Sequence, residues 1–495
     1  MKNAGAENLA IFTIVSNNYL HFARTMLQSA RSHHAGASLY CVIVDTDLSY
    51  AKALASEFET ISIANLNLPL GDEFLFQYSI LELNTAVKPW ALEYLLDRGH
   101  DSVVYVDPDI YFYWNMTEVE SSLLSGTNIL LTPHLLAPMV DAKTPSELDI
   151  RRSGAYNLGF CAVRESANTR QFLRWWQQKL TRNCVMDLEN GIFVDQGWID
   201  LVPGLFEKVG ILRHPGYNVA YWNLAQRPIN RDSSGAYLIG SAPLIFFHYS
   251  GLDLFDPNCL SKHENRFTLS TLGLAAELIE NYVQAVLQNR ASDYVQLEYG
   301  FGHFDSGDNV PAEIRKLYRM SETFKAQMGA KPFSNVVAMN DPFIEFTASH
   351  ESPTNAMVAV WMDRQDLQTI FPLKSVDSIH EFYRWFINDP VLSGRFPDIV
   401  MAHHKEVVEK WRRKSFGDKR RERTRESGKG PRRVLHLYAH ILGRKVDPAG
   451  FRSYGEMCNT SLGYLRAWRH IGFSAESRGK PRLLRRISKA LIFSP

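Results

Sequence analysis

The first hundred residues alternate short apolar runs with segments of helical spacing, and no other feature limits the possible fold as strongly. Residues 11–15 (IFTIV), 39–44 (LYCVIV) and 102–106 (SVVYV) are apolar runs rich in β-branched residues, as in buried parallel strands. Residues 19–33 and 87–96 carry apolar side chains at the spacing of one helix face. Strand–helix–strand repetition predicts an α/β fold in which helices cover both faces of a parallel sheet.

Polar residues follow the predicted strands, where sheets of this kind bind ligands. Ser16, Asn17 and Asn18 come after the first strand, and Asp45 comes after the second. We expect these side chains to border a ligand crevice at the carboxyl edge of the sheet. The same residue types also cap helices and form turns, so a structural role explains each of them as well.

Two carboxylates stand two residues apart at the end of the strand 102–106, in the order Asp107-Pro108-Asp109. On an extended backbone residues i and i+2 point the same way, so both carboxylates can face one point. Two close anions repel unless a cation lies between them, and Mg²⁺ and Mn²⁺ accept such hard oxygen ligands. We therefore predict a divalent metal site at Asp107 and Asp109. The alternative is that Asp-Pro-Asp only forms a turn.

The chain has 495 residues, and at roughly 150 residues per domain it is expected to hold two to four domains. Composition and patterning predict an α/β domain over residues 1–265 and a mostly helical accessory region over 266–410. A basic linker over 411–433 and a small, helical, basic domain over 434–495 are expected to follow.

Charge is distributed unevenly along the chain. Residues 401–495 hold 24 Lys and Arg against 8 Asp and Glu, a net charge of +16, whereas the whole chain carries +1. A basic unit of this kind can meet an anionic membrane surface, a nucleic acid or an acidic partner protein. A solvated linker followed by a helix accounts for the charge equally well. The last stretch, 482–493, has apolar residues at helical spacing among basic ones, a pattern that can lie on a membrane surface.

The five cysteines are odd in number and widely spaced, and no Cys-x-x-Cys occurs, which argues against a disulfide framework or a zinc site. No apolar stretch approaches the roughly 18 residues of a membrane span, and the N-terminus lacks a signal-peptide pattern. We expect a cytoplasmic protein. Any contact with a membrane should be peripheral, at the inner face, and made through the basic C-terminus. We expect no nucleic acid partner.

An ordered set of short segments carries a resemblance to a known family. The segments are IFTIVSNNYL, AVKPWALEYLL, VVYVDPDI, YNLGF, VDQGWID and FFHYSG, spread over about residues 9–265. In this order they resemble glycosyltransferases of the GT-A fold, similar to the glycogenin-like and bacterial lipopolysaccharide galactosyltransferase family. Two further phrases, GYNVAYWNL (216–224) and FGHFDSGDNVP (301–311), resemble bacterial surface-polysaccharide glycosyltransferases. Residues 434–480 resemble a small bacterial helical domain without an assigned activity.

The resemblance implies a GT-A (Rossmann-like), nucleotide-sugar-binding core with mostly helical C-terminal additions. It identifies Asp107 and Asp109 as the metal-binding pair and His248, in His-Tyr-Ser-Gly, as the third protein ligand. The family continues this last motif with Lys-Pro-Trp, where this chain reads Leu252-Asp253-Leu254, so the phosphate-contacting lysine of the family is missing. For His248 alone, a buried hydrogen-bonded histidine is the alternative.

The donor site implied by the resemblance lies in the loops after the first two strands. The family contacts uracil and ribose there, which assigns this role to Ser16, Asn17, Asn18 and Asp45. Lys88 precedes the metal-binding strand by one helix, and its point charge can neutralise phosphate.

The reaction centre implied by the resemblance comprises Asn157, in NLGF, and Asp195 and Gln196, in VDQG. In retaining members the Gln position lies beneath the anomeric carbon, where Gln196 would stabilise charge and position the sugar rather than attack it. In an inverting enzyme Asp195 could be the general base, and its structural alternative is to cap a helix over 196–201. The resemblance favours retention.

The sequence thus predicts an enzyme, a hexosyltransferase that uses Mn²⁺ or Mg²⁺ and a nucleotide-diphosphate sugar, with a UDP-sugar favoured. The expected acceptor is a glycan or lipid-linked glycan in bacterial surface polysaccharide or lipopolysaccharide assembly. One alternative is a sugar nucleotidyltransferase, which would need a Gly-rich basic loop after the first strand, where this chain has Ser16-Asn17-Asn18. A non-catalytic glycan-binding or scaffold protein is the other, and the Asp pair argues against it.

Overall fold

The computed structural model of the chain describes residues 8–256, 260–290, 296–336, 356–373, 375–418, 429–438, 453–455 and 457–472. Contacts divide the chain into two compact units, Met1–Gly302 and His303–Pro495. Within the described ranges no helix is both long enough and apolar enough to cross a membrane. The terminal segment 482–493, for which a helix was predicted, lies outside the described residues.

The first unit is built on a seven-stranded sheet with the strand order β10-β6-β7-β4-β1-β2-β3. Its strands are β1 Leu9–Val15, β2 Ser38–Ile43, β3 Glu59–Ser62, β4 Ser102–Val106, β6 Ile129–Pro133, β7 Tyr156–Arg164 and β10 Val209–Ile211. The pairs β1–β2, β1–β4, β2–β3 and β6–β10 are parallel. This architecture confirms the predicted α/β fold and its mostly parallel sheet.

Strand β7 is the exception, because it pairs antiparallel with both of its neighbours, β4 and β6. Its register sets Phe160 opposite Val106, and the backbone N–H of Asp107 continues the ladder by donating to the carbonyl of Gly159 at 2.8 Å. The segment 156–164 is buried almost throughout, as expected for a strand covered on both faces. Strand β7 therefore brings its N-terminal residues to the edge at which β4 ends.

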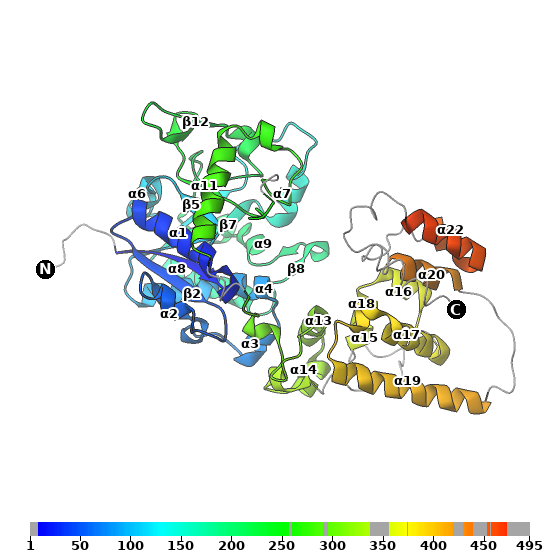
Figure 1. Cartoon of the computed structure of the whole chain (residues 1–495). Coiled ribbons are helices and arrows are strands. Elements are labelled where there is room, and N and C mark those ends of the chain that lie inside the picture. The colour runs from blue at the N-terminus through cyan, green and yellow to red at the C-terminus, as the bar shows by residue number, and fades with distance from the viewer. Residues whose placement is uncertain are drawn as a thin grey trace. The chain divides into compact units, whose positions relative to one another are not determined.

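Helices cover both faces of this sheet (Figure 1). The helices of this unit are α1 Leu20–His33, α2 Ala51–Leu54, α3 Asp72–Phe76, α4 Ile80–Ala86, α5 Lys88–Asp97, α6 Thr117–Leu124, α7 Glu147–Ser153, α8 Ala167–Leu180, α9 Gln196–Ile199, α10 Val202–Leu205 and α11 Leu274–Gln288. Side chains of α1 share one core with Ile11 and Val104, which alternate along their strands with Phe12 and Tyr105. On the Tyr105 face, the ammonium of Lys88, at the start of α5, lies 4.5 Å from the Tyr105 ring centre. The predicted helices 19–33 and 87–96 are thus confirmed as α1 and α5.

A second, small sheet has the strand order β11-β15-β5, and its strand β5 follows β4 along the chain. It contains β5 Ile110–Phe112, β11 Val219–Ala220 and β15 Phe246–His248. Strand β15 pairs antiparallel with β5, so that His248 is opposite Ile110, and parallel with β11, so that His248 is level with Ala220. Two further small sheets are present, one with β12 Ile229–Arg231, β13 Tyr237–Ile239 and β14 Ala242–Pro243, and one with β8 Met186–Asp187 and β9 Ile192–Phe193.

The second unit, as far as it is described, is helical. Its helices are α13 Ala312–Met320, α14 Glu322–Met328, α15 Ala356–Met362, α16 Gln365–Ile370, α17 Val376–Asn388, α18 Pro390–Ser393, α19 Asp398–Asp418, α20 Lys429–Leu437 and α22 Ser461–Gly472. Aromatic side chains of α17, among them Phe382 and Phe386, form its core with Phe371 and Phe396. The predicted helical additions are therefore present. Of the predicted linker 411–433, residues 411–418 belong to α19 and residues 429–433 to α20, and the residues between lie outside the described ranges.

Candidate metal centre

The two carboxylates of the Asp-Pro-Asp segment stand where the chain passes from β4 into β5. The backbone N–H of Ile110 donates to the carbonyl of Asp107 at 3.2 Å, which closes a turn with Pro108 at its second position, where proline is favoured. This turn uses only backbone groups, so both carboxylates stay available. The sequence offered a turn and a metal site as alternatives, and the structure shows that one segment can serve both.

The small sheet brings His248 to the same place from a distant part of the chain. Because His248 is opposite Ile110 in the β5–β15 pair, its imidazole lies beside the turn that precedes β5. The backbone N–H of Tyr249 donates to the carbonyl of Asp109 at 2.8 Å and ties the two segments together. His248 is 3% exposed and enters the site from the protein interior.

The three side chains form a group that could hold a metal ion. His248 Nε2 lies 3.0 Å from Asp109 Oδ1 and 3.6 Å from Asp107 Oδ2, and one ligand atom from each residue lies within 4.8 Å of the others. About three quarters of each carboxylate side chain is covered, so one side of the site faces solvent. An opening of this kind leaves room for ligands that the protein does not supply.

Glycine at position 159 allows the imidazole to lie against β7. A Cβ atom at Gly159 would be 2.4 Å from Cε1 of His248 and 2.8 Å from Oδ1 of Asn157. Real Cβ atoms do not approach other atoms so closely, so any side chain here would displace the imidazole or the Asn157 amide. The glycine of the NLGF segment is therefore a packing requirement of the metal centre.

A buried ion pair lies next to the site. Lys88 Nζ lies 2.8 Å from Asp195 Oδ2, and the two side chains are 3% and 2% exposed. Lys88 also donates to the carbonyl of Leu158 at 3.1 Å, and the hydroxyl of Tyr105 donates to Asp107. Lys88 and Asp195, which the sequence assigned to a donor contact and to the reaction centre, are thus each other's partners in the structure.

The electrostatics of the centre reflect burial opposed by pairing. Burial raises the pKa of Asp107, although Lys88 and His248 counteract it. Burial also raises the pKa of Asp195, and its pairing with Lys88 acts in the opposite direction. For His248 burial lowers the pKa, but the charges of Asp109 and Asp107 outweigh it, and the pKa is raised. The two carboxylates thus favour positive charge beside them, which is the behaviour expected of a site that attracts a cation.

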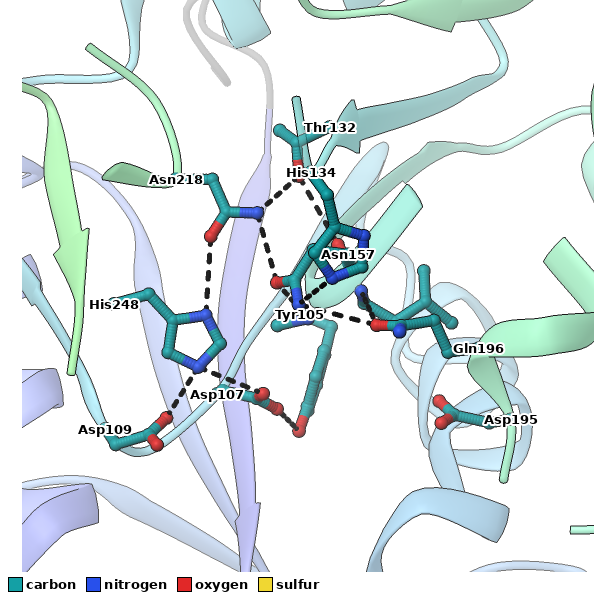
Figure 2. Close-up of polar contacts among 12 residues, drawn as sticks. Tyr105, Asp107, Asp109, Thr132, His134, Asn157, Asp195, Gln196, Asn218 and His248 are labelled. Atoms are coloured by element: carbon teal, nitrogen blue, oxygen red, sulfur yellow. Dashed lines mark hydrogen bonds and ion pairs between the residues drawn. The ribbon is translucent and has the colours of Figure 1, made fainter. Parts of the chain in front are cut away.

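A chain of hydrogen bonds joins His248 to the predicted reaction centre, as Figure 2 shows. His248 Nδ1 lies 3.3 Å from Asn218 Oδ1, and Asn218 Nδ2 donates to Asn157 Oδ1 at 3.0 Å. Asn157 Nδ2 in turn lies 3.4 Å from Gln196 Oε1, which also accepts the backbone N–H of Leu158 at 2.9 Å. The four side chains joined by these hydrogen bonds, His248, Asn218, Asn157 and Gln196, are all buried.

The polar residues after β1 and β2 form a second cluster at the same edge of the sheet. The Asp45 carboxylate accepts backbone N–H groups of Asn17, Thr46 and Gly300 at 2.9 to 3.1 Å. Ser16 Oγ donates to the carbonyl of Val44 at 2.9 Å and accepts from Asn84. The amide of Asn17 donates to the carbonyl of Asp47 at 2.8 Å. Asn18 is half-buried beside them. The cluster is ordered by its own hydrogen bonds, and its contact with a donor stays a prediction.

Several residues were not singled out from the sequence, namely Tyr105, Thr132, His134 and Asn218 of the centre and Gly300 of the second cluster. Asn218 had a signal, because it lies in the segment GYNVAYWNL and its backbone has a φ of +52°, a conformation in which Asn is favoured. Gly300 also had one, because it immediately precedes the segment 301–311, and a Cβ there would be 1.8 Å from Thr46 Oγ1. Nothing local marks His134, which burial keeps neutral by lowering its pKa to about 4.

Comparison with known proteins gives remote matches. No family model matches the chain. The chain is 24% identical over 305 residues to the uncharacterized protein YfnF of Bacillus subtilis (strain 168), covering 61% of this chain and 98% of YfnF. A structure of the galactosyltransferase LgtC with donor and acceptor sugar analogs matches with 15% identity and a TM-score of 0.35, covering 56% of this chain and 95% of LgtC. The apo-form glycosyltransferase GlyE of Streptococcus pneumoniae TIGR4 matches with 15% identity and a TM-score of 0.35, covering 60% and 67%.

Proposed function

We propose that the chain is a metal-dependent glycosyltransferase that transfers a hexose from a nucleotide-diphosphate sugar, with a UDP-sugar favoured. The proposed acceptor is a glycan or lipid-linked glycan in the assembly of a bacterial surface polysaccharide or lipopolysaccharide. The motif order along residues 9–265 supports the reaction class, and the α/β core with its site at the carboxyl edge of the sheet is the setting that such a donor requires.

One observation carries the proposal: Asp107, Asp109 and His248 converge although about 140 residues separate the first two from the third. Metal–ligand bonds of about 2.1 Å in an octahedron place neighbouring ligand atoms about 3.0 Å apart and opposite ones about 4.2 Å apart. The separations of 3.0 and 3.6 Å from His248 Nε2 to the two carboxylates fall in this range. Two carboxylates and one imidazole suit Mn²⁺, and Mg²⁺ with less preference for the nitrogen.

When bound, such an ion would hold the diphosphate of the donor and neutralise the charge of the leaving group. The residues of the chain prepare the site for it. Asp107 and Asp109 supply two negative charges at a solvent-facing opening, and His248 closes the inner side. The hydroxyl of Tyr105 orients Asp107, and the buried charge of Lys88 is balanced by Asp195.

At the reaction centre we propose retention of configuration, with Gln196 as the residue beneath the sugar. Asp195 is 1% exposed and held by Lys88, so it is poorly placed to take a proton from an acceptor hydroxyl. Gln196 lies instead on the hydrogen-bond chain that leads to the metal ligand His248. NMR of the first-formed product decides the point: a product with inverted configuration would move the catalytic assignment to Asp195.

The donor nucleotide is proposed to bind beside the cluster of Ser16, Asn17, Asn18 and Asp45. These residues follow β1, which is next to β4, and β2, which is next to β1, so a ligand that spans both places would lie across one edge of the sheet. For the basic C-terminal residues we propose peripheral contact with an anionic membrane. Deletion of residues 411–495 should weaken binding to phosphatidylserine vesicles at low salt, and full-length protein that ignores such vesicles would refute the contact.

The test of the function is nucleotide-sugar hydrolysis and transfer with and without metal. With a panel of UDP-sugars, turnover should require Mn²⁺ or Mg²⁺, stop with EDTA and return when the ion is restored. Asp107→Asn and Asp109→Asn should each lower kcat by orders of magnitude while circular dichroism stays unchanged. Glu59→Gln, which removes an exposed carboxylate on β3, is the matched control and should leave turnover unchanged. Full activity in EDTA would reject the metal role.

A further inference from the structure

A histidine that holds a metal through Nε2 must keep its proton on Nδ1, because each nitrogen of a neutral imidazole is either a donor or an acceptor. Nε2 of His248 faces Asp107 and Asp109, so the group that meets Nδ1 decides whether this tautomer is favoured. That group is Asn218, whose Oδ1 lies 3.3 Å from Nδ1. A side-chain amide can present either its oxygen or its nitrogen, and only the oxygen would favour the proton on Nδ1.

The orientation of these amides is set by the backbone. The N–H of Gly159 can only donate, and it meets Asn157 Oδ1 at 3.1 Å. The N–H of Leu158 meets Gln196 Oε1 at 2.9 Å in the same way. With both oxygens determined, the Asn157 amide nitrogen must face Gln196 Oε1, at 3.4 Å, and His134 Nε2, at 3.2 Å. Both of those atoms can accept a hydrogen bond.

The same logic passes from Asn157 to Asn218. Asn157 Oδ1 is an acceptor, so the atom of Asn218 that meets it at 3.0 Å must be the amide nitrogen. The second hydrogen of that nitrogen meets Thr132 Oγ1, also at 3.0 Å. Asn218 Oδ1 is therefore left facing His248, as Figure 2 shows. Reversing Asn218 would set nitrogen against the Nδ1 proton and oxygen against Asn157 Oδ1, and such mismatched groups are costly at a side chain that is 0% exposed.

The backbone at Asn218 restricts the residue type as well. Its φ of +52° is a conformation that Asn, Asp and Gly adopt more readily than other residues. The carbonyl of Asn218 accepts from Asn223 Nδ2 at 2.9 Å, and Asn223 Oδ1 accepts the N–H of Ala220 at 3.0 Å. This second asparagine holds the segment in place from its other side, so the amide of Asn218 is presented from a rigid support.

We propose that Asn157 and Asn218 form an amide relay, anchored on the N–H of Gly159, that keeps the proton of His248 on Nδ1 and so commits Nε2 to a metal ion. The inference rests on the metal site of the proposed function and adds two positioning residues to it. Neither acts on the sugar through this relay; both act through His248. Groups that orient a metal-bound histidine typically change metal affinity about 10- to 100-fold when removed.

Metal affinity provides the first test. Titration of the full chain with MnCl₂ alone, followed by the EPR signal of free Mn²⁺, should show a dissociation constant about 10- to 100-fold higher for Asn218→Gly than for the wild type. Glycine accepts the positive φ, so the backbone is preserved. Asn218→Asp keeps an oxygen acceptor and should stay closer to the wild type. Thr132→Val removes the other partner of the Asn218 amide but leaves the orienting contact with Asn157, so its affinity should change by less than about threefold.

The tautomer provides the second test and is independent of activity. In the Co²⁺-loaded protein the Nδ1 proton should appear as a shifted signal that is present in H₂O and lost in D₂O. It should persist in Asn218→Asp and Thr132→Val and vanish through fast exchange in Asn218→Gly. The relay would be overturned by equal Mn²⁺ affinity in wild type and Asn218→Gly. It would also be overturned if Asn218→Gly and Thr132→Val weakened Mn²⁺ binding equally, or if the Nδ1 signal persisted in Asn218→Gly. Failure of the wild type to bind Mn²⁺ would instead reject the metal site and the relay with it.

Discussion

The buried pair of Lys88 and Asp195 allows a quantitative test of how the centre is supported. Lys88→Met keeps the length of the side chain and removes its charge. The carboxylate of Asp195, 2% exposed, then loses its partner at 2.8 Å, and Asp107 loses a nearby positive charge. Breaking a buried ion pair from one side costs about 3–5 kcal/mol, because the remaining charge stays desolvated. We therefore expect Lys88→Met to destabilise the first unit by this amount.

Thermal unfolding of the full chain measures the effect. Unfolding entropy of about 2.1 cal/mol/K per residue gives about 0.6 kcal/mol/K for a unit of about 300 residues, so the Tm of the first unit should fall by about 5–8 °C. The transition of the second unit should not move. Arg98→Met breaks an exposed pair with Glu59 and is the matched control, with an expected cost of at most about 1 kcal/mol.

A double-mutant cycle separates pairing from packing. Asp195→Asn should cost less than Lys88→Met, because Asp107 still attracts the ammonium. The double variant should be more stable than the sum of the single effects predicts, by up to about 3 kcal/mol, because it leaves no unpaired charge. The cost of Lys88→Met should also shrink as the pH falls, since burial favours the protonated form of the Asp195 carboxyl, which needs no cation. Additive effects, or a Lys88→Met variant as stable as Arg98→Met, would refute the reasoning.

Two further predictions follow from packing and from buried histidines. Gly159→Ala should destabilise the first unit by about 1–3 kcal/mol and weaken Mn²⁺ binding, because its Cβ would overlap the His248 imidazole. Gly204→Ala, with open space around the added Cβ, is the control and should do neither. Equal Mn²⁺ binding by the two variants would contradict this prediction. Burial lowers the pKa of His21, His34 and His134 to about 4. Below pH 6.5 the folded state therefore binds fewer protons than the unfolded state. Each histidine should then cost up to about 1.4 kcal/mol of folding stability per pH unit as the pH falls from 6.5 towards 4. The urea midpoint of the first unit should fall between pH 7.5 and 5.0, and fall less in His134→Gln; identical slopes in both proteins would count against the assignment.

Much of the first unit was predictable because its signals are local. The runs that become β1, β2 and β4 are apolar on both faces, and their lengths and flanking residues suffice to mark them as buried strands. The carboxylates of Asp107 and Asp109 follow one of these strands directly, so their place at the carboxyl edge could be inferred from the strand alone. For His248 the sequence offered a strand end and a motif, and the group with Asp107 and Asp109 is confirmed as one that could hold a metal.

The tertiary structure decided which residues contact each other across long stretches of sequence. The antiparallel course of β7, the pairing of Lys88 with Asp195 and the contact of Asn218 with His248 join residues 30 to about 110 positions apart. Local periodicity carries no information about such pairs, because a buried lysine or asparagine has the same sequence neighbours whichever partner it meets. Partner choice follows from sheet register and from the cost of leaving a buried charge or amide unsatisfied, and both are properties of the folded chain.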